Sequence, residues 1–130
     1  MKFAIVVYGA PYSDQASRSG YLFTRAVLEQ GHDVYRVFFY HDGVYTANAL
    51  AVPPQDEADI QLDWATLGKD HDLDMVVCIA SALRRGMLDK AEANRYEKHA
   101  ANINTQFTIS GLGQLIDASL QADKIVTFGV

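Results

Sequence analysis

The sequence contains a single cysteine, Cys78, among its 130 residues. One cysteine cannot form a disulfide within the chain, and zinc sites built from several cysteines are excluded for the same reason. A lone free thiol is typical of proteins in a reducing compartment, so we expect a cytoplasmic location.

Long hydrophobic runs are also missing. The longest uncharged apolar stretches have the length of a strand, far below the roughly 20 residues that a membrane-spanning helix needs. At the N-terminus, one lysine and a short apolar stretch precede Gly9 and Pro11, which is too short a pattern for a signal peptide. We therefore expect no transmembrane segment and no membrane partner.

Complete nucleotide-binding motifs are absent as well. Gly9 follows a predicted strand without the further glycines of a dinucleotide loop, and Gly111 and Gly113 lack a third glycine. No Walker motif occurs, and His41 and Asp42 are adjacent rather than spaced to chelate a metal. The sequence therefore predicts neither a cofactor nor a metal. A nucleotide- or flavin-binding module of similar architecture remains an alternative.

An excess of basic residues is lacking too. The net charge is -5, with 11 basic against 16 acidic residues, the opposite of the balance expected for direct nucleic-acid binding. The charge is unevenly placed, because residues 55–74 hold seven acids and one lysine, whereas residues 84–98 hold five basic residues and three acids. Both stretches fit solvated helix faces; alternatively, the basic stretch serves an anion near Cys78.

What the sequence does contain is an alternation of strand and helix patterns. Continuous apolar runs predict strands buried on both faces at Lys2–Tyr8 (KFAIVVY), Asp33–Tyr40 (DVYRVFFY) and Asp74–Ala80 (DMVVCIA). Shorter strands are expected at 107–110 and 124–128. Helical patterns run from a cap at Ser13 or Asp14 to Gln30, from a cap at Asp56, from Asp89 to about His99, and from Gly111 to Ala122. This order predicts an α/β fold, a single doubly wound domain over residues 1–130. We expect a mostly parallel sheet of four to five strands with helices on both faces.

Cys78 is the first candidate for chemistry. It lies near the end of a predicted strand, where ligands and reactive groups gather in such sheets, and a helix pattern starts two or three residues later. Arg84 and Arg85 follow one to two turns further on, and their positive charge would favour a reactive thiolate. The alternative is that Cys78 is a small hydrophobic core residue.

His41 is the only histidine at the predicted carboxyl end of a strand, so it is the one placed to approach Cys78. The alternative is a solvated histidine in a turn. Aromatic residues gather around the same strand, which fits either core packing or a subunit interface. They are Tyr35, Phe38, Phe39, Tyr40 and Tyr45.

Three further segments are informative together: RVFFYHDGVYTAN (Arg36 to Asn48), LDMVVCIASALRRGMLD (Leu73 to Asp89) and ISGLGQLIDASLQADKIVTF (Ile109 to Phe128). They resemble the DsrE/TusD family, and with the opening KFAIVV the resemblance covers essentially the whole chain. The resemblance implies a sulfurtransferase in which Cys78 carries sulfur as a persulfide. The segment GVYTANAL resembles the TusD side, whereas YHDGV, PPQDE and LDMVVC resemble the DsrE side.

The resemblance also implies partners. Similar proteins assemble with two smaller homologous subunits (TusC/TusB-like or DsrF/DsrH-like) as a dimer of heterotrimers. They take sulfur from an upstream persulfide donor protein and pass it to a TusE/DsrC-type acceptor. The expected use is 2-thiolation of the wobble uridine of tRNA, with sulfur oxidation as the alternative. A third possibility is a structural subunit in which Cys78 is inert.

Overall fold

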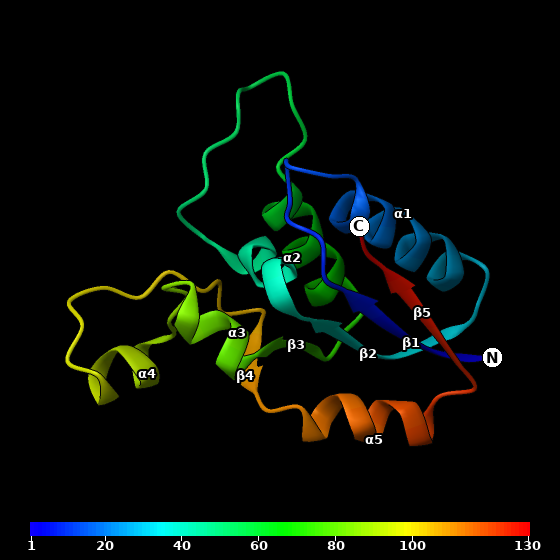
Figure 1. Ribbon diagram of the computed structural model, residues 1–130. Coiled ribbons are helices and arrows are strands. Elements are labelled where there is room, and N and C mark those ends of the chain that lie inside the picture. The colour runs from blue at the N-terminus through cyan, green and yellow to red at the C-terminus, as the bar shows by residue number, and fades with distance from the viewer.

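The computed structural model describes all residues from 1 to 130. Its centre is a five-stranded sheet with the order β4-β3-β2-β1-β5, in which every pair of neighbours is parallel (Figure 1). The predicted fold class is therefore confirmed, with five parallel strands. The strands are β1 (Lys2–Val7), β2 (Asp33–Phe39), β3 (Met75–Cys78), β4 (Thr108–Ser110) and β5 (Lys124–Phe128).

Helices cover both faces of this sheet. The helices α1 and α2 lie on one face and α5 lies across the other (Figure 1). The chain steps from β1 to β2 to β3 in one direction and returns through α5 to β5 in the opposite direction. Because crossovers between parallel strands are right-handed, a reversal of direction places the connecting helix on the opposite face. The helices are α1 (Ala16–Glu29), α2 (Ile60–Asp70), α3 (Ile79–Arg84), α4 (Lys90–Arg95) and α5 (Gly113–Gln121).

The hydrophobic core has two unequal parts. The face beneath α1 and α2 carries a cluster of 16 buried residues, which includes Ile5, Val37 and the fully buried Trp64. The other face carries a cluster of three, Phe38, Val76 and Cys78. Both faces of the central strands are thus buried, which explains their continuous apolar sequences. The aromatic residues Phe38 and Phe39 lie in this core.

Several predicted helix ends differ from the structure. The N-cap of α1 is Gln15 rather than Ser13 or Asp14, and α5 begins at Gly113 rather than at Gly111. The N-cap of α2 is Asp59, whose side chain accepts a hydrogen bond from the amide of Leu62 at 3.1 Å. The predicted cap, Asp56, lies in a turn closed by the bond from the Glu57 amide to the Pro54 carbonyl. The helix α4 ends at Arg95 rather than near residue 99, because Glu97 adopts a left-handed φ of 56° and ends it.

The segment after β2 is a 3₁₀ helix, η1 (His41–Ala47). It is packed inward, with Val44 and Ala47 fully buried. Gly43 allows this close packing, because a Cβ atom there would lie 2.2 Å from the carbonyl oxygen of Val7. The segment that follows the second strand is therefore an ordered part of the core.

The longest helix, α1, has 14 residues. No helix in the structure combines the length and the apolar character that crossing a bilayer requires.

Candidate active site

Cys78 is the last residue of β3, and α3 begins at the next residue. Its Cα pairs with that of Ser110 in the neighbouring strand β4. The cysteine therefore lies at the carboxyl edge of the sheet, as the sequence predicted, at the point where the chain turns from a strand into a helix.

The thiol of Cys78 is covered. The residue is 1% exposed and packs with Phe38 and Val76, while the partly buried side chains of Tyr40 and Leu115 pack against this cluster. Cys78 occupies the N-cap position of α3, yet its side chain makes no capping hydrogen bond. A thiol in this place meets a bulky reagent only when the side chains above it move.

Leu115 is held in place by the anchoring of α5 to β2. Arg36 donates hydrogen bonds from Nη1 to the carbonyl oxygen of Gln114 at 2.7 Å and to Oδ2 of Asp117 at 3.0 Å. The hydroxyl of Tyr35 donates to the same oxygen of Asp117 at 2.6 Å. These contacts lie on both sides of Leu115 in the sequence, so they fix the turn of α5 that packs against the Cys78 cluster.

The hydrogen bonds that anchor α5 to β2 also shift the pKa values of Asp117 and Tyr35. The hydrogen bonds from Tyr35 and Arg36 hold the pKa of the Asp117 carboxyl below its ordinary range. The same hydrogen bond to Asp117 raises the pKa of the Tyr35 hydroxyl. Asp74 accepts a further bond from Arg36 Nε at 2.7 Å, so the buried guanidinium is shared between two carboxylates.

His41 begins η1 with a left-handed φ of 48°. Its backbone amide donates a hydrogen bond to Oγ of the buried Ser81 in α3 at 3.1 Å. Its ring packs against that of Tyr40, with 4.0 Å between the ring centroids and 56° between the ring planes. His41 is therefore exposed and adjacent to the cover of Cys78, and it has no hydrogen bond to the thiol.

The two predicted arginines have different surroundings. Arg85 donates from Nε to Oδ1 of Asp42 at 2.8 Å and from Nη1 to the carbonyl oxygen of Ser81 at 3.1 Å. Arg84 is exposed and forms no ion pair. No hydrogen bond or ion pair joins Cys78 to His41 or to either arginine.

Sequence reasoning missed several residues of this region. Asp42 and Ser81 join the segments after β2 and β3, and Tyr40 and Leu115 pack against the cluster that holds the thiol. In the sequence, Asp42 is marked only by its position next to His41. Its pairing with Arg85 spans 43 residues, and no local pattern indicates it.

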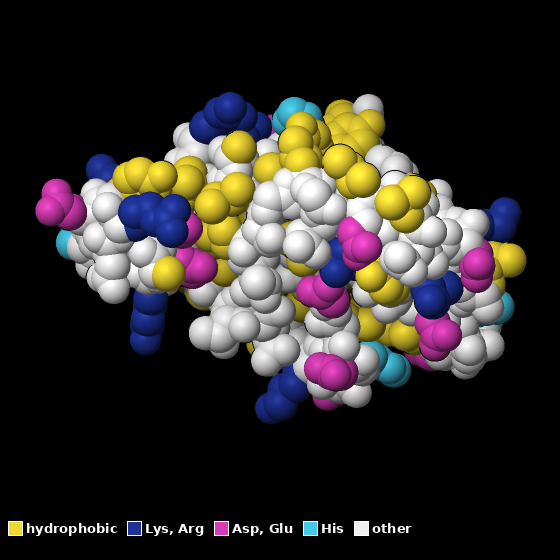
Figure 2. Space-filling model, turned by 90° about the horizontal axis from the view of Figure 1, so that it is seen from below, with side chains coloured by type: hydrophobic (Ala, Val, Ile, Leu, Met, Phe, Trp, Pro, Cys, Tyr) yellow, Lys and Arg dark blue, Asp and Glu magenta, His cyan; other side chains and the backbone are white.

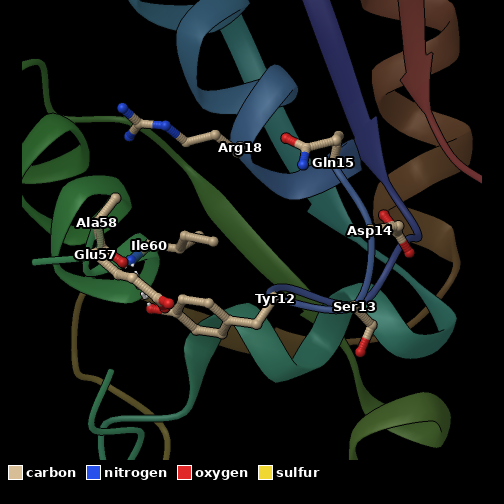
Figure 3. A pocket seen from close by; sticks show the side chains of 8 residues that line it. All are labelled: Tyr12, Ser13, Asp14, Gln15, Arg18, Glu57, Ala58 and Ile60. Atoms are coloured by element: carbon tan, nitrogen blue, oxygen red, sulfur yellow. Dashed lines mark hydrogen bonds between the residues drawn. The ribbon is translucent and has the colours of Figure 1, made fainter. Parts of the chain in front are cut away.

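A separate cavity of about 220 Å³ lies beside the N-terminus of α1 (Figure 3). Tyr12 reaches across it, donating from its hydroxyl to the Ala58 carbonyl at 3.1 Å and accepting from the Ile60 amide at 3.0 Å (Figure 3). Arg18 on its wall is paired with Asp63 at 2.8 Å. These groups bind one another and hold the loop before α2, so we assign no chemistry to this cavity.

No cluster of three or more metal-ligating side chains occurs in the structure.

Comparison with known proteins matches residues 1–128 to the DsrE/DsrF-like family. The chain is 54% identical over 129 residues to the DsrE protein of Allochromatium vinosum, covering 99% of both chains. It is 44% identical over 128 residues to sulfurtransferase TusD of Salmonella typhi, covering 98% of this chain and 100% of that protein. Its fold is similar to the crystal structure of the ychN protein from E. coli, with a TM-score of 0.79, 24% identity, and coverage of 98% and 99% of the two chains.

Proposed function

The chain belongs to the DsrE/DsrF-like family and is a sulfurtransferase of the DsrE/TusD type, and we propose that it carries sulfur as a persulfide on Cys78. The observation that carries this proposal is the place of the only cysteine, at the carboxyl end of a buried parallel strand directly before a helix. Reactive groups of open α/β sheets gather at this edge. The match to the family along almost the whole chain supports the same assignment.

The proposed reaction has two exchange steps. The Cys78 thiolate attacks the outer sulfur of a donor persulfide; the donor's S–S bond breaks, the donor leaves as a thiolate, and Cys78 becomes a persulfide. The thiolate of an acceptor protein then attacks the outer sulfur of Cys78, which leaves as a thiolate. Each step forms one S–S bond and breaks another, so no external oxidant or reductant is consumed.

The burial of the thiol adds a condition to this mechanism. Because Cys78 is 1% exposed beneath the side chains of Tyr40 and Leu115, both exchange steps require that this cover opens. The partner proteins reach the sulfur from the side of η1 and α5. Arg85 holds η1 against α3 in this scheme, since its guanidinium is bound to Asp42, and Arg84 is free to contact a partner.

We also propose that residues 1–130 act as one domain within a larger assembly in the cytoplasm. Exposed apolar side chains support the presence of subunit partners. Leu112, Ile116 and Leu120 recur every four residues along α5 and are 46%, 62% and 77% exposed. Figure 2 shows hydrophobic side chains gathered over this face of the molecule. The proposed partners are two smaller homologous subunits, in a dimer of heterotrimers, together with a persulfide donor and a TusE/DsrC-type acceptor.

The use of the sulfur has two candidates. The first is 2-thiolation of the wobble uridine of tRNA, supported by the 44% identity to TusD and by the acidic net charge of -5, which fits transfer through a carrier protein. The second is sulfur oxidation, favoured by the higher identity of 54% to DsrE. Deletion of the gene distinguishes them: loss of 2-thiouridine from tRNA supports the first, and intact 2-thiouridine with impaired oxidation of stored sulfur supports the second.

A structural subunit is the competing function, and the burial of Cys78 in the isolated chain favours it. The variant Cys78→Ser tests the choice in the complete assembly. The persulfide proposal predicts that sulfur transfer to the acceptor is abolished while the assembly forms normally. Unchanged transfer by Cys78→Ser would show that another subunit carries the sulfur.

A further inference from the structure

A groove of about 440 Å³ lies at the end of α3, in the same part of the molecule as Cys78. It is formed where the last turn of α3, the following loop and the end of α4 meet. Its lining residues are Leu83, Arg84, Gly86, Leu88, Tyr96 and Lys98. The groove is distinct from the cavity of Figure 3, with which it shares no residue.

Two cations that form no ion pair line this groove. Arg84 is the only arginine that forms no ion pair, whereas Arg18, Arg25, Arg36, Arg85 and Arg95 each contact a carboxylate. Lys98 is also exposed and, like the other four lysines of the chain, forms no ion pair. Two free cations thus flank one groove in a chain whose net charge is -5. Lysine and arginine side chains beside hydrophobic ones are visible at the end of the molecule that holds α3 and α4 (Figure 2).

The rest of the lining is apolar. Leu83 and Leu88 are half-buried, and Tyr96 is 51% exposed without a hydrogen bond to its hydroxyl. Apolar side chains between two cations fit a ligand that combines apolar groups with carboxylates, and they do not fit a basic or purely polar one.

The groove is also within reach of the sulfur. The helix α3 has six residues, with Cys78 at its N-cap and Arg84 as its last residue. At about 1.5 Å per residue, the helix separates the two ends by about 9 Å. An extended segment rises about 3.3 Å per residue, so roughly three residues of a docked chain span that distance.

We propose that this groove binds an acidic, apolar segment of the protein that receives sulfur from Cys78, a few residues from the receiving cysteine. The inference rests on the proposed function, because it assigns the docking site of the acceptor in the same transfer. Arg84 and Lys98 pair with carboxylates of the segment, and Leu83, Leu88 and Tyr96 contact its apolar side chains. The docked segment brings the acceptor thiol to the edge of the sheet where Cys78 lies.

The test uses the full chain loaded with a persulfide and two synthetic acceptor peptides. Both peptides end in cysteine and alternate leucine with polar residues; one carries aspartates and the other carries asparagines at the same positions. The measured quantity is the ratio of the sulfur-transfer rates to the aspartate and asparagine peptides. Taking this ratio for each variant removes the effect of charge on the peptide thiol itself. We expect Arg84→Glu and Lys98→Glu each to lower the ratio by about fivefold or more, and added salt to lower it in the unaltered chain.

The matched control is Lys69→Glu, which makes the same change of charge at an exposed, unpaired lysine at the end of α2. We expect it to keep the ratio of the unaltered chain, and we expect thermal unfolding to be the same for all three variants. Equal ratios in Arg84→Glu, Lys98→Glu and Lys69→Glu would overturn the docking site.

A binding measurement separates this inference from the proposed function. Peptides with serine in place of cysteine are titrated into the unloaded chain, and binding is followed by fluorescence anisotropy. Tighter binding of the aspartate peptide, lost in Arg84→Glu and Lys98→Glu, supports the groove even if no persulfide forms on Cys78. Equal binding of the two peptides to the unaltered chain would refute it even if the persulfide does form.

Discussion

Arg85 donates a hydrogen bond of 2.8 Å from Nε to Oδ1 of Asp42, and the pair joins the end of α3 to the start of η1. The same guanidinium donates to the Ser81 carbonyl, so one side chain ties the segments that follow β2 and β3. These segments flank the buried thiol of Cys78. The charge of Arg85 is balanced by Asp42, and its contribution is to hold the rim of the site in one arrangement.

The first prediction concerns this ion pair. Arg85→Ala removes the hydrogen bonds to Asp42 and Ser81, and we expect the free energy of unfolding to fall by about 0.5–1 kcal/mol, because Asp42 is more than half exposed and the pair is screened. Urea unfolding measures the change. The neighbouring variant Arg84→Ala loses no pair and serves as the control, with an expected change of only a few tenths of a kcal/mol. Equal effects of the two substitutions would contradict the assigned role of Arg85.

The second prediction concerns the cover of the thiol. Leu115→Ala removes a side chain that packs against the Cys78 cluster, and we expect the rate at which native Cys78 reacts with a thiol reagent to rise on the order of tenfold. Labelling is followed in the absence of denaturant. Leu120→Ala shortens a leucine of the same helix that is 77% exposed, and it should leave the rate unchanged. Rapid labelling of the unaltered chain would show that the cover does not restrict access.

The third prediction concerns the pH dependence of the anchor between α5 and β2. Hydrogen bonds from Tyr35 and Arg36 lower the pKa of Asp117 in the folded chain, so its carboxylate stabilises the fold above the ordinary pKa. That stabilisation is lost as the pH falls through the lowered pKa. We therefore expect the Tm difference between the unaltered chain and Asp117→Asn to be largest near pH 7 and to shrink from about pH 4 downward.

Thermal unfolding of both proteins between neutral and acid pH provides this measurement. The control is Asp123→Asn, another carboxylate near the sheet, which accepts a hydrogen bond from the Lys2 amide and contacts neither Tyr35 nor Arg36. A Tm difference for Asp117→Asn that stays constant with pH would show that the carboxylate does not gain stability from these hydrogen bonds.

The fourth prediction concerns the close contact of η1 with β1. Gly43→Ala places a Cβ atom 2.2 Å from the backbone oxygen of Val7, which cannot move without distorting the central strand. We expect a loss of about 2 kcal/mol or more in the free energy of unfolding. Gly113→Ala, at the first position of α5, meets no atom within 4 Å and should be neutral or slightly stabilising. Similar stabilities of the two variants would contradict the close approach.

The strands could be predicted from the sequence because parallel strands buried on both faces have continuous apolar sequences. KFAIVV forms β1 almost as expected, whereas β3 (Met75–Cys78) is shorter than the predicted strand Asp74–Ala80, because α3 begins directly after Cys78. The sequence alone does not determine which residue caps the N-terminus of α2. Asp56 and Asp59 are both suitable caps, and the turn at Pro54 decides between them, placing Asp56 outside the helix.

The surroundings of the candidate site could not be predicted, because they depend on contacts between distant segments. Arg84 and Arg85 are equivalent in the sequence; the position of Asp42, brought close by η1, gives only Arg85 a partner. The burial of Cys78 depends on Tyr40 and Leu115, which come from β2's end and from α5. The inward packing of η1 depends on the approach of Gly43 to Val7, which no local pattern indicates.

The central claim, that Cys78 carries sulfur, is tested most directly by the intact mass of the chain within its native assembly after treatment with a persulfide donor. We predict a gain of roughly 32 Da per sulfur atom that is removed by a reductant, maps to the peptide containing Cys78, and is absent in Cys78→Ser. A persulfide found only on other subunits of the loaded assembly, with Cys78 unmodified, would contradict the claim and assign this chain a structural role.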